Sequence, residues 1–378
     1  MAVHIAFSGN NAWGMYNFRG KLLSYYVEKG FRVTVLVPYD DVFSQKLVDM
    51  GCEVHNMPMN PKGINPISDI CLLYRYYTML KKLNPDISIT YTIKPNVYGG
   101  LAARFLNIPY LPITTGLGYV FIQRNIITAI VKRLYRFAFK KAQYVWFLNN
   151  DDVETFRKEK IVLDDKIQLL PGEGIDLSRF VPVEKKGNRD SFVFLFVGRM
   201  LKDKGVREFV DAARILRKKY PSVVFRLLGA VWEGNPASID LEQLREWERE
   251  GCVEYLGEVM NVKPCLEDAD CVVLPSYYRE GVPFTLMEGA AMELPLVATD
   301  NIGCREVVKD GYNGFLCTIK DVDSLVVAME KILKLSPEER RVLGKNGRKL
   351  MEENFELNHI IKQYDRTIES ILSESKKK

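Results

Sequence analysis

Residues 271–288 read CVVLPSYYREGVPFTLME, and this stretch decides the fold class of the chain. Its first five residues form a short apolar run of the kind that makes a buried strand. A polar turn with glycine follows, and Pro283 then suits the first turn of a helix, where its missing N–H costs nothing. The stretch therefore predicts a strand, a turn and a helix, which is the repeating unit of a parallel α/β sheet.

The same alternation of short apolar runs and amphipathic segments continues in both directions along the chain. In the first half it predicts helices at 16–29, 67–83 and 125–142, and strands at 3–8, 31–38, 52–57, 86–90, 110–114 and 144–148. In the second half it predicts strands at 192–197, 223–228, 253–256, 271–275, 296–298 and 314–317. We therefore expect an α/β chain with two doubly wound, Rossmann-like parallel sheets.

A length of 378 residues favours two domains, because ordinary domains contain about 100–200 residues. Residues 181–190, VPVEKKGNRD, have little to bury, and their position near the midpoint favours an interdomain linker over an ordinary surface loop. We expect domains at 1–181 and 191–355, and a C-terminal helix at 356–378 that packs back toward the first domain. Two such domains would face a central cleft at the carboxyl ends of their strands, where ligands bind in these folds.

Composition excludes several classes of protein. The net charge of +5 is too small to suggest nucleic acid as a partner. Seven cysteines without a C-x-x-C pair indicate free thiols in a reducing compartment, and three scattered histidines argue against a histidine-rich metal centre. No apolar run approaches the roughly 18 residues of a membrane span, and the N-terminus lacks a basic leader. We expect a soluble, cytoplasmic chain.

Dinucleotide and P-loop chemistry are also disfavoured. The turn after the first predicted strand reads SGNNAWG (8–14), which is not G-x-G-x-x-G. Gly116 and Gly118 are followed by Phe121 where a third glycine would be needed, and no Walker A lysine motif occurs. The turn from Gly9 to Gly14 would let a ligand approach the backbone, although a plain tight turn explains it equally well.

The helix predicted after Pro283 forms the first candidate site. Free main-chain N–H groups of Phe284, Thr285 and Leu286 at a helix N-terminus form a phosphate-binding arrangement. Glu288 falls one turn later, where its carboxylate could accept both hydroxyls of a ribose. A routine ion pair for Glu288 and a capping role for Glu280 are the alternatives, and for one carboxylate alone they are favoured.

Two cations strengthen the ligand-binding interpretation. Arg199 follows the strand predicted at 192–197, and Lys204 comes after a short loop, so both would lie at the carboxyl edge of the same sheet. A planar guanidinium and a compact ammonium together suit a diphosphate. Solvated surface charges are the alternative.

Together these motifs resemble the pattern of retaining GT-B glycosyltransferases of the large family four group. The resemblance lies in Gly198-Arg199, Lys204-Gly205, Pro275-Ser276, Glu280-Gly281 and Glu288, and the two glutamates match the E-x7-E spacing of that family. The N-terminal half resembles bacterial enzymes that extend undecaprenyl-diphosphate-linked glycans, through Tyr16-Asn17-Phe18-Arg19, Lys94-Pro95-Asn96 and Gly116-Leu117-Gly118. Within that group it is similar to N-acetylgalactosaminyltransferases and galactosyltransferases.

The resemblance implies a GT-B fold, an acceptor-binding N-terminal domain, a nucleotide-sugar-binding C-terminal domain and a role for each matching residue. Arg199 and Lys204 would bind the donor diphosphate, Glu280 would contact the transferred sugar and Glu288 the ribose. Donor contacts are also implied for the main chain of Phe284, Thr285 and Leu286, for the nucleobase-binding stretch ending at Val259, and for Gly14, Asn17, Thr115 and Gly116. Thr115 stands where many members have His or Glu, which leaves the identity of the sugar open.

The expected reaction needs neither metal nor cofactor, since fixed cations and a helix terminus would stabilise the leaving diphosphate of a UDP-sugar. Two sequences, Asp268-Ala269-Asp270 and Asp321-Val322-Asp323, have the D-x-D form that other glycosyltransferases use for manganese. Both fall at predicted element ends away from the other motifs, so we interpret them as structural.

The stretch 125–141 interleaves large apolar residues with cations and predicts a basic amphipathic helix that lies on a membrane surface. Its membrane or acceptor residues would be Arg124, Lys132, Arg133, Arg136 and Lys140. A buried helix with a solvated basic edge is the alternative. We therefore expect a hexosyltransferase on the inner face of the cell membrane that extends a polyprenyl-diphosphate-linked saccharide. The other hypotheses are an enzyme of the same fold that acts on a soluble acceptor, and a two-domain sugar-binding protein without catalytic activity.

Overall fold

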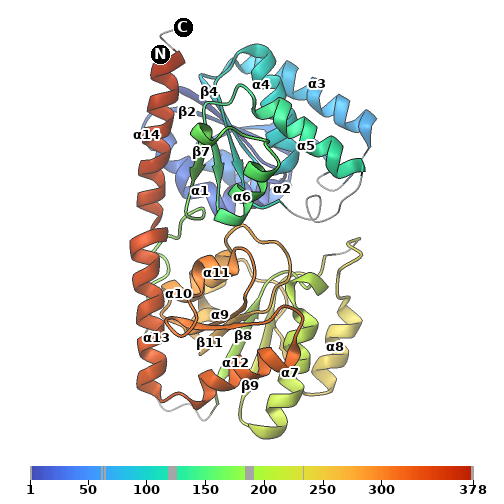
Figure 1. The fold of residues 1–378 in the computed structure, drawn as a ribbon, viewed down its shortest axis with the longest axis vertical. Coiled ribbons are helices and arrows are strands. Elements are labelled where there is room, and N and C mark those ends of the chain that lie inside the picture. The colour runs from blue at the N-terminus through green and yellow to red at the C-terminus, as the bar shows by residue number, and fades with distance from the viewer. Residues whose placement is uncertain are drawn as a thin grey trace. The chain divides into compact units, whose positions relative to one another are not determined.

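The computed structural model describes residues 2–60, 63, 65–117, 126–183, 191–232 and 234–375. The chain forms two compact units (Figure 1). The first contains Met1–Glu173 and Ile360–Lys378, and the second contains Gly174–His359. The predicted functional division between acceptor and donor domains stays a prediction.

The first unit contains a parallel sheet of seven strands in the order β3-β2-β1-β4-β5-β6-β7. The strands are β1 His4–Ser8, β2 Arg32–Val37, β3 Glu53–Asn56, β4 Ile87–Tyr91, β5 Tyr110–Thr114, β6 Val145–Phe147 and β7 Ile167–Leu169. The six predicted strands are confirmed. Sequence reasoning missed β7, because its three residues are too short for an alternation to be visible.

Helices cover both faces of this sheet, as a parallel sheet requires. They are α1 Ala12–Glu28, α2 Asp41–Asp49, α3 Pro66–Leu83, the π-helical turn η1 Pro95–Gly99, α4 Gly100–Leu106, α5 Ile126–Phe139, α6 Asn150–Lys158 and the 3₁₀ turn η3 Asp164–Lys166. Figure 1 shows α3, α4 and α5 side by side. Their buried side chains, among them Tyr76, Leu80, Tyr135 and Phe139, form one core with the sheet.

The second unit has six parallel strands in the order β10-β9-β8-β11-β12-β13. They are β8 Val193–Val197, β9 Val224–Leu228, β10 Glu254–Tyr255, β11 Cys271–Leu274, β12 Leu296–Thr299 and β13 Gly314–Cys317, and all six were predicted. The helical elements are η4 Lys202–Lys204, α7 Val206–Lys219, α8 Leu241–Arg249, α9 Lys263–Glu267, α10 Phe284–Ala291, α11 Cys304–Val307, α12 Val322–Lys334, α13 Pro337–Leu350 and η5 Met351–Phe355.

The chain passes between the units at Glu173/Gly174 and again within α14, Leu357–Ser375. Residues 174–183 belong to the second unit, where Arg348 donates to the carbonyl of Phe180 at 2.6 Å. Most of the predicted linker, 184–190, lies outside the described residues. From Ile360 onward the chain belongs to the first unit, and there Tyr364 shares a 2.8 Å hydrogen bond with Tyr91.

All seven cysteines lie among the described residues and are free, as predicted, although Cys71 is exposed rather than buried. Within the same part of the chain, no helix has the length and apolarity that crossing a membrane demands.

A buried ion pair fixes the end of the first unit. Arg19 of α1 contacts the carboxylate of Glu173, and both side chains are less than a tenth exposed. The guanidinium also donates to the carbonyl of Gly14 at 3.2 Å and lies 4.0 Å from the ring centroid of Tyr91. Burial raises the pKa of Glu173, and the positive charge of Arg19 opposes that rise.

We predict that Arg19→Met lowers the free energy of unfolding of the first unit by about 3–5 kcal/mol, because it leaves a buried carboxylate unpaired. Urea denaturation measures the change. The double variant Arg19→Met/Glu173→Leu should recover much of the loss. The matched control is Arg32→Met, which breaks the exposed pair with Glu53 and should cost less than about 1 kcal/mol. Equal losses for the buried and the exposed pair would contradict this prediction.

Candidate functional site

The candidate donor site lies at the carboxyl edge of the second sheet, where β8 lies next to β11. Strand order reverses at this point, and α/β sheets bind ligands outside the carboxyl ends of such strands. Arg199 follows β8, Lys204 ends η4, and the segment from Ser276 to Glu280 follows β11.

The structure brings Lys204 and Glu280 into direct contact. The ammonium of Lys204 pairs with Oε1 of Glu280, and their side chains are only 14% and 10% exposed. The hydroxyl of Ser276 donates to the same carboxylate oxygen at 2.9 Å. A cation and a carboxylate that were predicted to hold different parts of one donor therefore form one buried cluster.

Backbone contacts fix the position of this cluster. The carbonyl of Asp203 accepts the amides of Tyr277 at 3.0 Å and Tyr278 at 2.9 Å, which ties η4 to the segment after β11. Gly205 has a φ of +79°, and a Cβ there would lie 2.1 Å from the carbonyl oxygen of Pro275. Only glycine allows this close approach, so Gly205 fixes the place of Lys204.

Sequence reasoning missed Asn301, which follows β12 and holds the same segment from its other side. Its side-chain amide donates to the carbonyls of Tyr278 at 2.8 Å and Ser276 at 3.2 Å. The signal that could have found it is its position just beyond a strand that the sequence predicts beside β11.

Helix α10 begins one residue later than predicted. Pro283 has an extended ψ of 118° and precedes the helix, so it does not lie in the first turn. The amide of Leu286 donates to the carbonyl of Pro283 at 3.2 Å and is not free, which corrects the prediction of three free N–H groups. The hydroxyl of Thr285 donates to the carbonyl of Val197 at 3.2 Å and holds the helix N-terminus against the end of β8.

Glu288 is the unsatisfied carboxylate of the site. Among the described residues its carboxylate has neither a hydrogen-bond donor nor an ion-pair partner. Burial raises the pKa of Glu288 to about 7, and the charge of Arg179 opposes this rise. Sequence reasoning missed Arg179 because it lies more than a hundred residues earlier in the chain.

Arg199 and Val259 are both exposed at this edge of the second unit. The guanidinium of Arg199 lies 4.3 Å from the ring centroid of Trp232. No contact in the described part of the chain joins Arg199 to the Lys204–Glu280 cluster. Arg199 is therefore available to a ligand, whereas Lys204 already has a partner.

In the first unit, the carboxyl edge contains a helix N-terminus instead of a long glycine turn. Helix α1 starts at Ala12, so Gly14 is helical, and its amide donates to the side-chain oxygen of the N-cap residue Asn11 at 2.6 Å. Asn17 donates to the carbonyl of Trp13 at 3.0 Å. The predicted turn from Gly9 to Gly14 is thus shorter than expected.

The ends of β4 and β5 complete this edge. Thr115 and Gly116 follow β5 and are half-buried, with a φ of +120° at Gly116, while Gly118 lies outside the described residues. Thr92 follows β4 with a φ of +67°, which is unusual for a β-branched residue. The hydroxyls of Thr92 and Thr114 are buried without a hydrogen-bond partner.

The basic residues predicted to meet a membrane differ in their surroundings. Lys132 pairs with Glu159 at 2.7 Å, and Arg136 donates to the carbonyls of Glu159 at 2.6 Å and Lys160 at 3.3 Å. Arg133 and Lys140 are exposed. Arg124 lies outside the described residues. Two of the five predicted cations therefore have partners within the protein.

Comparisons with known proteins identify the family. Residues 180–350 match the model described as glycosyl transferases group 1, and residues 4–149 match the model described as glycosyl transferase 4-like. The chain is 30% identical to the N,N'-diacetylbacillosaminyl-diphospho-undecaprenol alpha-1,3-N-acetylgalactosaminyltransferase of Campylobacter jejuni, over 98% of this chain and all of that protein. The chain belongs to the group 1 glycosyltransferases.

Further relatives agree with this family and its fold. An Escherichia coli UDP-Gal:alpha-D-GlcNAc-diphosphoundecaprenol alpha-1,3-galactosyltransferase is 28% identical over 82% of this chain and 81% of its own length. A glycosyltransferase structure from Rickettsia africae matches with a TM-score of 0.79 at 18% identity, covering 98% of this chain and 99% of that one. An Anabaena HepE structure with UDP-glucose gives 0.78 at 18% identity over 97% and 99%. The predicted GT-B fold is confirmed, and the family consists of retaining enzymes.

Three of the four aspartates in the D-x-D sequences of this glycosyltransferase make contacts within the protein. Asp268 pairs with Arg226, and Asp270 accepts the amide of Val193 at 2.8 Å. Asp321 caps α12 by accepting the amide of Ser324 at 2.9 Å. In the described ranges, no three His, Cys, Asp or Glu side chains are grouped as metal ligands.

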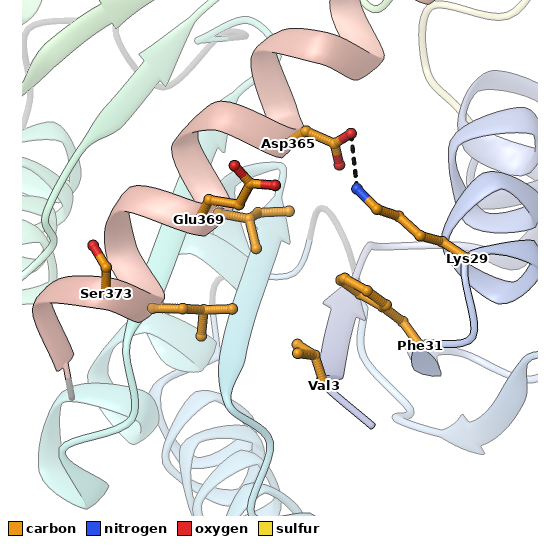
Figure 2. Close-up of a pocket in the computed structure, with 8 residues that line it drawn as sticks. Val3, Lys29, Phe31, Asp365, Glu369 and Ser373 are labelled. Atoms are coloured by element: carbon orange, nitrogen blue, oxygen red, sulfur yellow. Dashed lines mark hydrogen bonds and ion pairs between the residues drawn. The ribbon is translucent and has the colours of Figure 1, made fainter. Parts of the chain in front are cut away.

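The first unit contains a pocket beside α14 (Figure 2). Val3 and Phe31, which precede β1 and β2, line it together with Ile368 and Leu372 of α14. Lys29 and Asp365 form a 3.1 Å ion pair at its rim. The pocket opens at the amino edge of the sheet, whereas ligands of this fold bind at the carboxyl edge.

We predict that Glu288→Gln stabilises the nucleotide-free glycosyltransferase at pH 8 by up to about 3 kcal/mol, since each pKa unit corresponds to about 1.4 kcal/mol. As the pH rises from about 4.5 to 7, the unfolded carboxyl loses its proton first, so Glu288 destabilises the fold progressively. Urea denaturation between pH 5 and 8 should show the advantage of the variant growing across that window. Glu242→Gln, at an exposed position, is the control. A stability difference that does not depend on pH would contradict the assignment.

Proposed function

We propose that this glycosyltransferase transfers a hexose or N-acetylhexosamine, with GalNAc or Gal favoured, from a UDP-sugar to an undecaprenyl-diphosphate-linked glycan. Such a step belongs to the assembly of surface polysaccharides or glycoprotein glycans. The observation that carries the proposal is the buried Lys204–Glu280 pair at the same sheet edge as the unpartnered Glu288. The names of the Campylobacter and Escherichia relatives support the donor and the acceptor.

The donor diphosphate meets Arg199 and Lys204. As the bond between the anomeric carbon and the diphosphate breaks, negative charge grows on the leaving oxygen, and these preformed cations stabilise it. A bond from the acceptor oxygen to the same face of the anomeric carbon gives retention. The proton of the acceptor hydroxyl passes to the leaving diphosphate, which becomes UDP.

The two glutamates hold different parts of the donor. Glu280, fixed by Ser276 and Lys204, accepts hydroxyls of the transferred sugar. Glu288 accepts the ribose hydroxyls, which supply the hydrogen-bond donors that its carboxylate lacks in the free protein. Main-chain groups of Phe284 and Thr285 lie nearest the phosphates, and Val259 lies near the nucleobase.

The first unit binds the acceptor in this proposal. Thr115 and Gly116 lie at its carboxyl edge and contact the transferred sugar, and the edge also includes Gly14 and Asn17. Exposed Arg133 of α5 and exposed Lys140, which directly follows α5, attract anionic headgroups and the acceptor diphosphate, which holds the enzyme peripherally on the inner face of the membrane.

A panel of UDP-sugars tests the proposal directly. Purified enzyme is incubated with each donor and either an undecaprenyl-diphosphate-linked saccharide or the same saccharide without lipid, and UDP release is followed. Release that requires the lipid-linked acceptor supports the proposal. Equal release with the lipid-free saccharide would favour a soluble acceptor, and no release with any acceptor would leave a sugar-binding protein.

We predict that Lys204→Ala and Arg199→Ala each lower kcat about 10²–10³-fold, because each removes a cation whose interaction strengthens as the diphosphate leaves. Lys202→Ala is the matched control, since Lys202 lies in the same turn and forms no side-chain ion pair in the described part of the chain. Steady-state kinetics and thermal melting separate chemistry from folding. Near-wild-type turnover in either site variant would remove that residue from the diphosphate site.

We predict that Glu288→Gln weakens binding of UDP alone, whereas Glu280→Gln affects transfer more than UDP affinity. Ribose hydroxyls favour the ionised form of Glu288, so UDP binding near pH 7 should release a proton. Calorimetry in two buffers of different ionisation enthalpy measures both the affinity and the proton. Proton release should disappear in Glu288→Gln and persist in Glu280→Gln; equal losses of UDP affinity in both variants would contradict the division of roles.

A further inference from the structure

Helix α3 presents a row of apolar side chains to solvent. Ile67 is 74% exposed, and Ile70 and Tyr74 are each 68% exposed. Their spacing of three and four residues places them on one face of the helix, together with the exposed Cys71. Exposed apolar residues are normally scattered singly, so a row of this kind indicates an interaction surface.

The opposite face of α3 already supplies the core. Leu72, Tyr76, Leu80 and Leu83 are buried against the sheet and α4. The side chains of Ile67, Ile70 and Tyr74 are therefore not part of that core, and the described residues of the first unit leave them exposed.

The charges around the row are almost all positive. Residues 57–150 include twelve Lys or Arg and only two Asp or Glu. One of these carboxylates, Asp69, is the only acidic residue of α3 and pairs with Lys94 at 2.6 Å. Farther along the exposed face of the helix come Arg75, Lys81 and Lys82. The face thus changes from apolar to basic along its length.

The neighbouring helices α4 and α5 also expose apolar and basic side chains. Phe105 of α4 and Phe137 of α5 are about half exposed, with ring centroids 6.3 Å apart, and the guanidinium of Arg104 lies 3.9 Å from the centroid of Phe137. Exposed Arg133 lies on the same α5, and exposed Lys140 directly follows it. Apolar side chains mixed with cations are complementary to the boundary between headgroups and acyl chains of an anionic bilayer.

We propose that the row Ile67, Ile70 and Tyr74 of α3 inserts into the surface layer of an anionic phospholipid membrane and is the apolar anchor of this enzyme. Arg75, Lys81 and Lys82 then meet the headgroups. The inference rests on the proposed function for its purpose, since a lipid-linked acceptor lies in that membrane. This apolar row differs from Arg133 and Lys140, which attract the membrane surface but supply little apolar area.

The test compares two triple variants by cosedimentation with vesicles containing phosphatidylglycerol. Ile67→Gln/Ile70→Gln/Tyr74→Gln should lower the partition coefficient at least about tenfold, because three apolar side chains no longer leave water. The control Leu163→Gln/Tyr312→Gln/Val327→Gln removes one tyrosine and two aliphatic side chains that are also exposed but lie outside α3, α4 and α5, and it should bind as the wild type does. Wild-type binding by the α3 variant would overturn the proposal.

Salt separates the two contributions. Arg133→Gln/Lys140→Gln should weaken vesicle binding at low salt and have little effect at raised salt, where surface charges are screened. The loss in the α3 variant should persist at both salt concentrations. If raised salt abolishes the difference between the α3 variant and wild type, the apolar row makes no salt-independent contribution to vesicle binding and the proposal fails.

Cys71 gives a second readout, because it is the only exposed thiol among the described residues and lies within the row. On a Cys265→Ser background, an environment-sensitive fluorophore on Cys71 should shift to the blue with anionic vesicles and become protected from an aqueous quencher. Binding without a shift would place the membrane contact elsewhere and overturn the proposal. A wild-type dimer that the α3 variant converts to a monomer would assign the face to a second copy and also overturn it.

Activity measurements in detergent test the proposed function separately from the membrane anchor. UDP affinity and transfer to a lipid-linked acceptor in detergent should be unchanged in the α3 variant, because both depend on residues elsewhere. Unchanged activity with unchanged vesicle binding would refute the anchor alone.

Discussion

Parallel strands impose the constraint on which this structure depends. Every strand in both sheets runs in the same direction, so each must return through a covering element, and all carboxyl ends meet at one edge of their sheet. Side chains separated by many residues thereby become neighbours, as with Lys204 before α7 and Glu280 after β11. The chemistry of the second unit follows from this geometry, since its cations, carboxylates and helix N-terminus all lie where strands end.

The Lys204–Glu280 pair shows how such an edge holds a charged side chain in a fixed position. A buried ion pair contributes little to stability, because the loss of hydration offsets much of the attraction between the charges. The pair instead fixes a position: Ser276, the carbonyl of Asp203 and the close approach at Gly205 hold the cation at the sheet edge. Glu288 is the contrasting case, since its carboxylate lacks donors and burial raises its pKa to about 7. One carboxylate is satisfied within the protein, while the other has hydrogen-bonding capacity left for a ligand.

Sequence patterns predicted twelve of the thirteen strands, because buried parallel strands are short continuous apolar runs bounded by turns. They also placed Arg199, Lys204, Glu280 and Glu288 at one sheet edge. They could not show contacts between such segments: that Lys132 pairs with Glu159, or that Arg179 lies near Glu288. These depend on distances between segments that are far apart in the sequence, and residue spacing within one segment contains no information about them.

Helix α3 shows that sequence periodicity can also fail to identify which face of a helix is buried. Its sequence, PISDICLLYRYYTMLKKL, is apolar around much of its circumference, so periodicity predicts a helix without deciding which face is buried. Packing decides it: Tyr76 and Leu80 enter the core, and Ile67, Ile70 and Tyr74 remain in water. On α5 the reverse holds, since a strongly basic amphipathic sequence predicts a surface helix, yet Lys132 and Arg136 have partners within the protein. The exposed apolar row thus lies on a helix whose sequence resembles that of a core helix. Amphipathicity measures only how unevenly apolar residues are distributed around a helix. Which apolar side chains stay exposed is decided by how the domain packs.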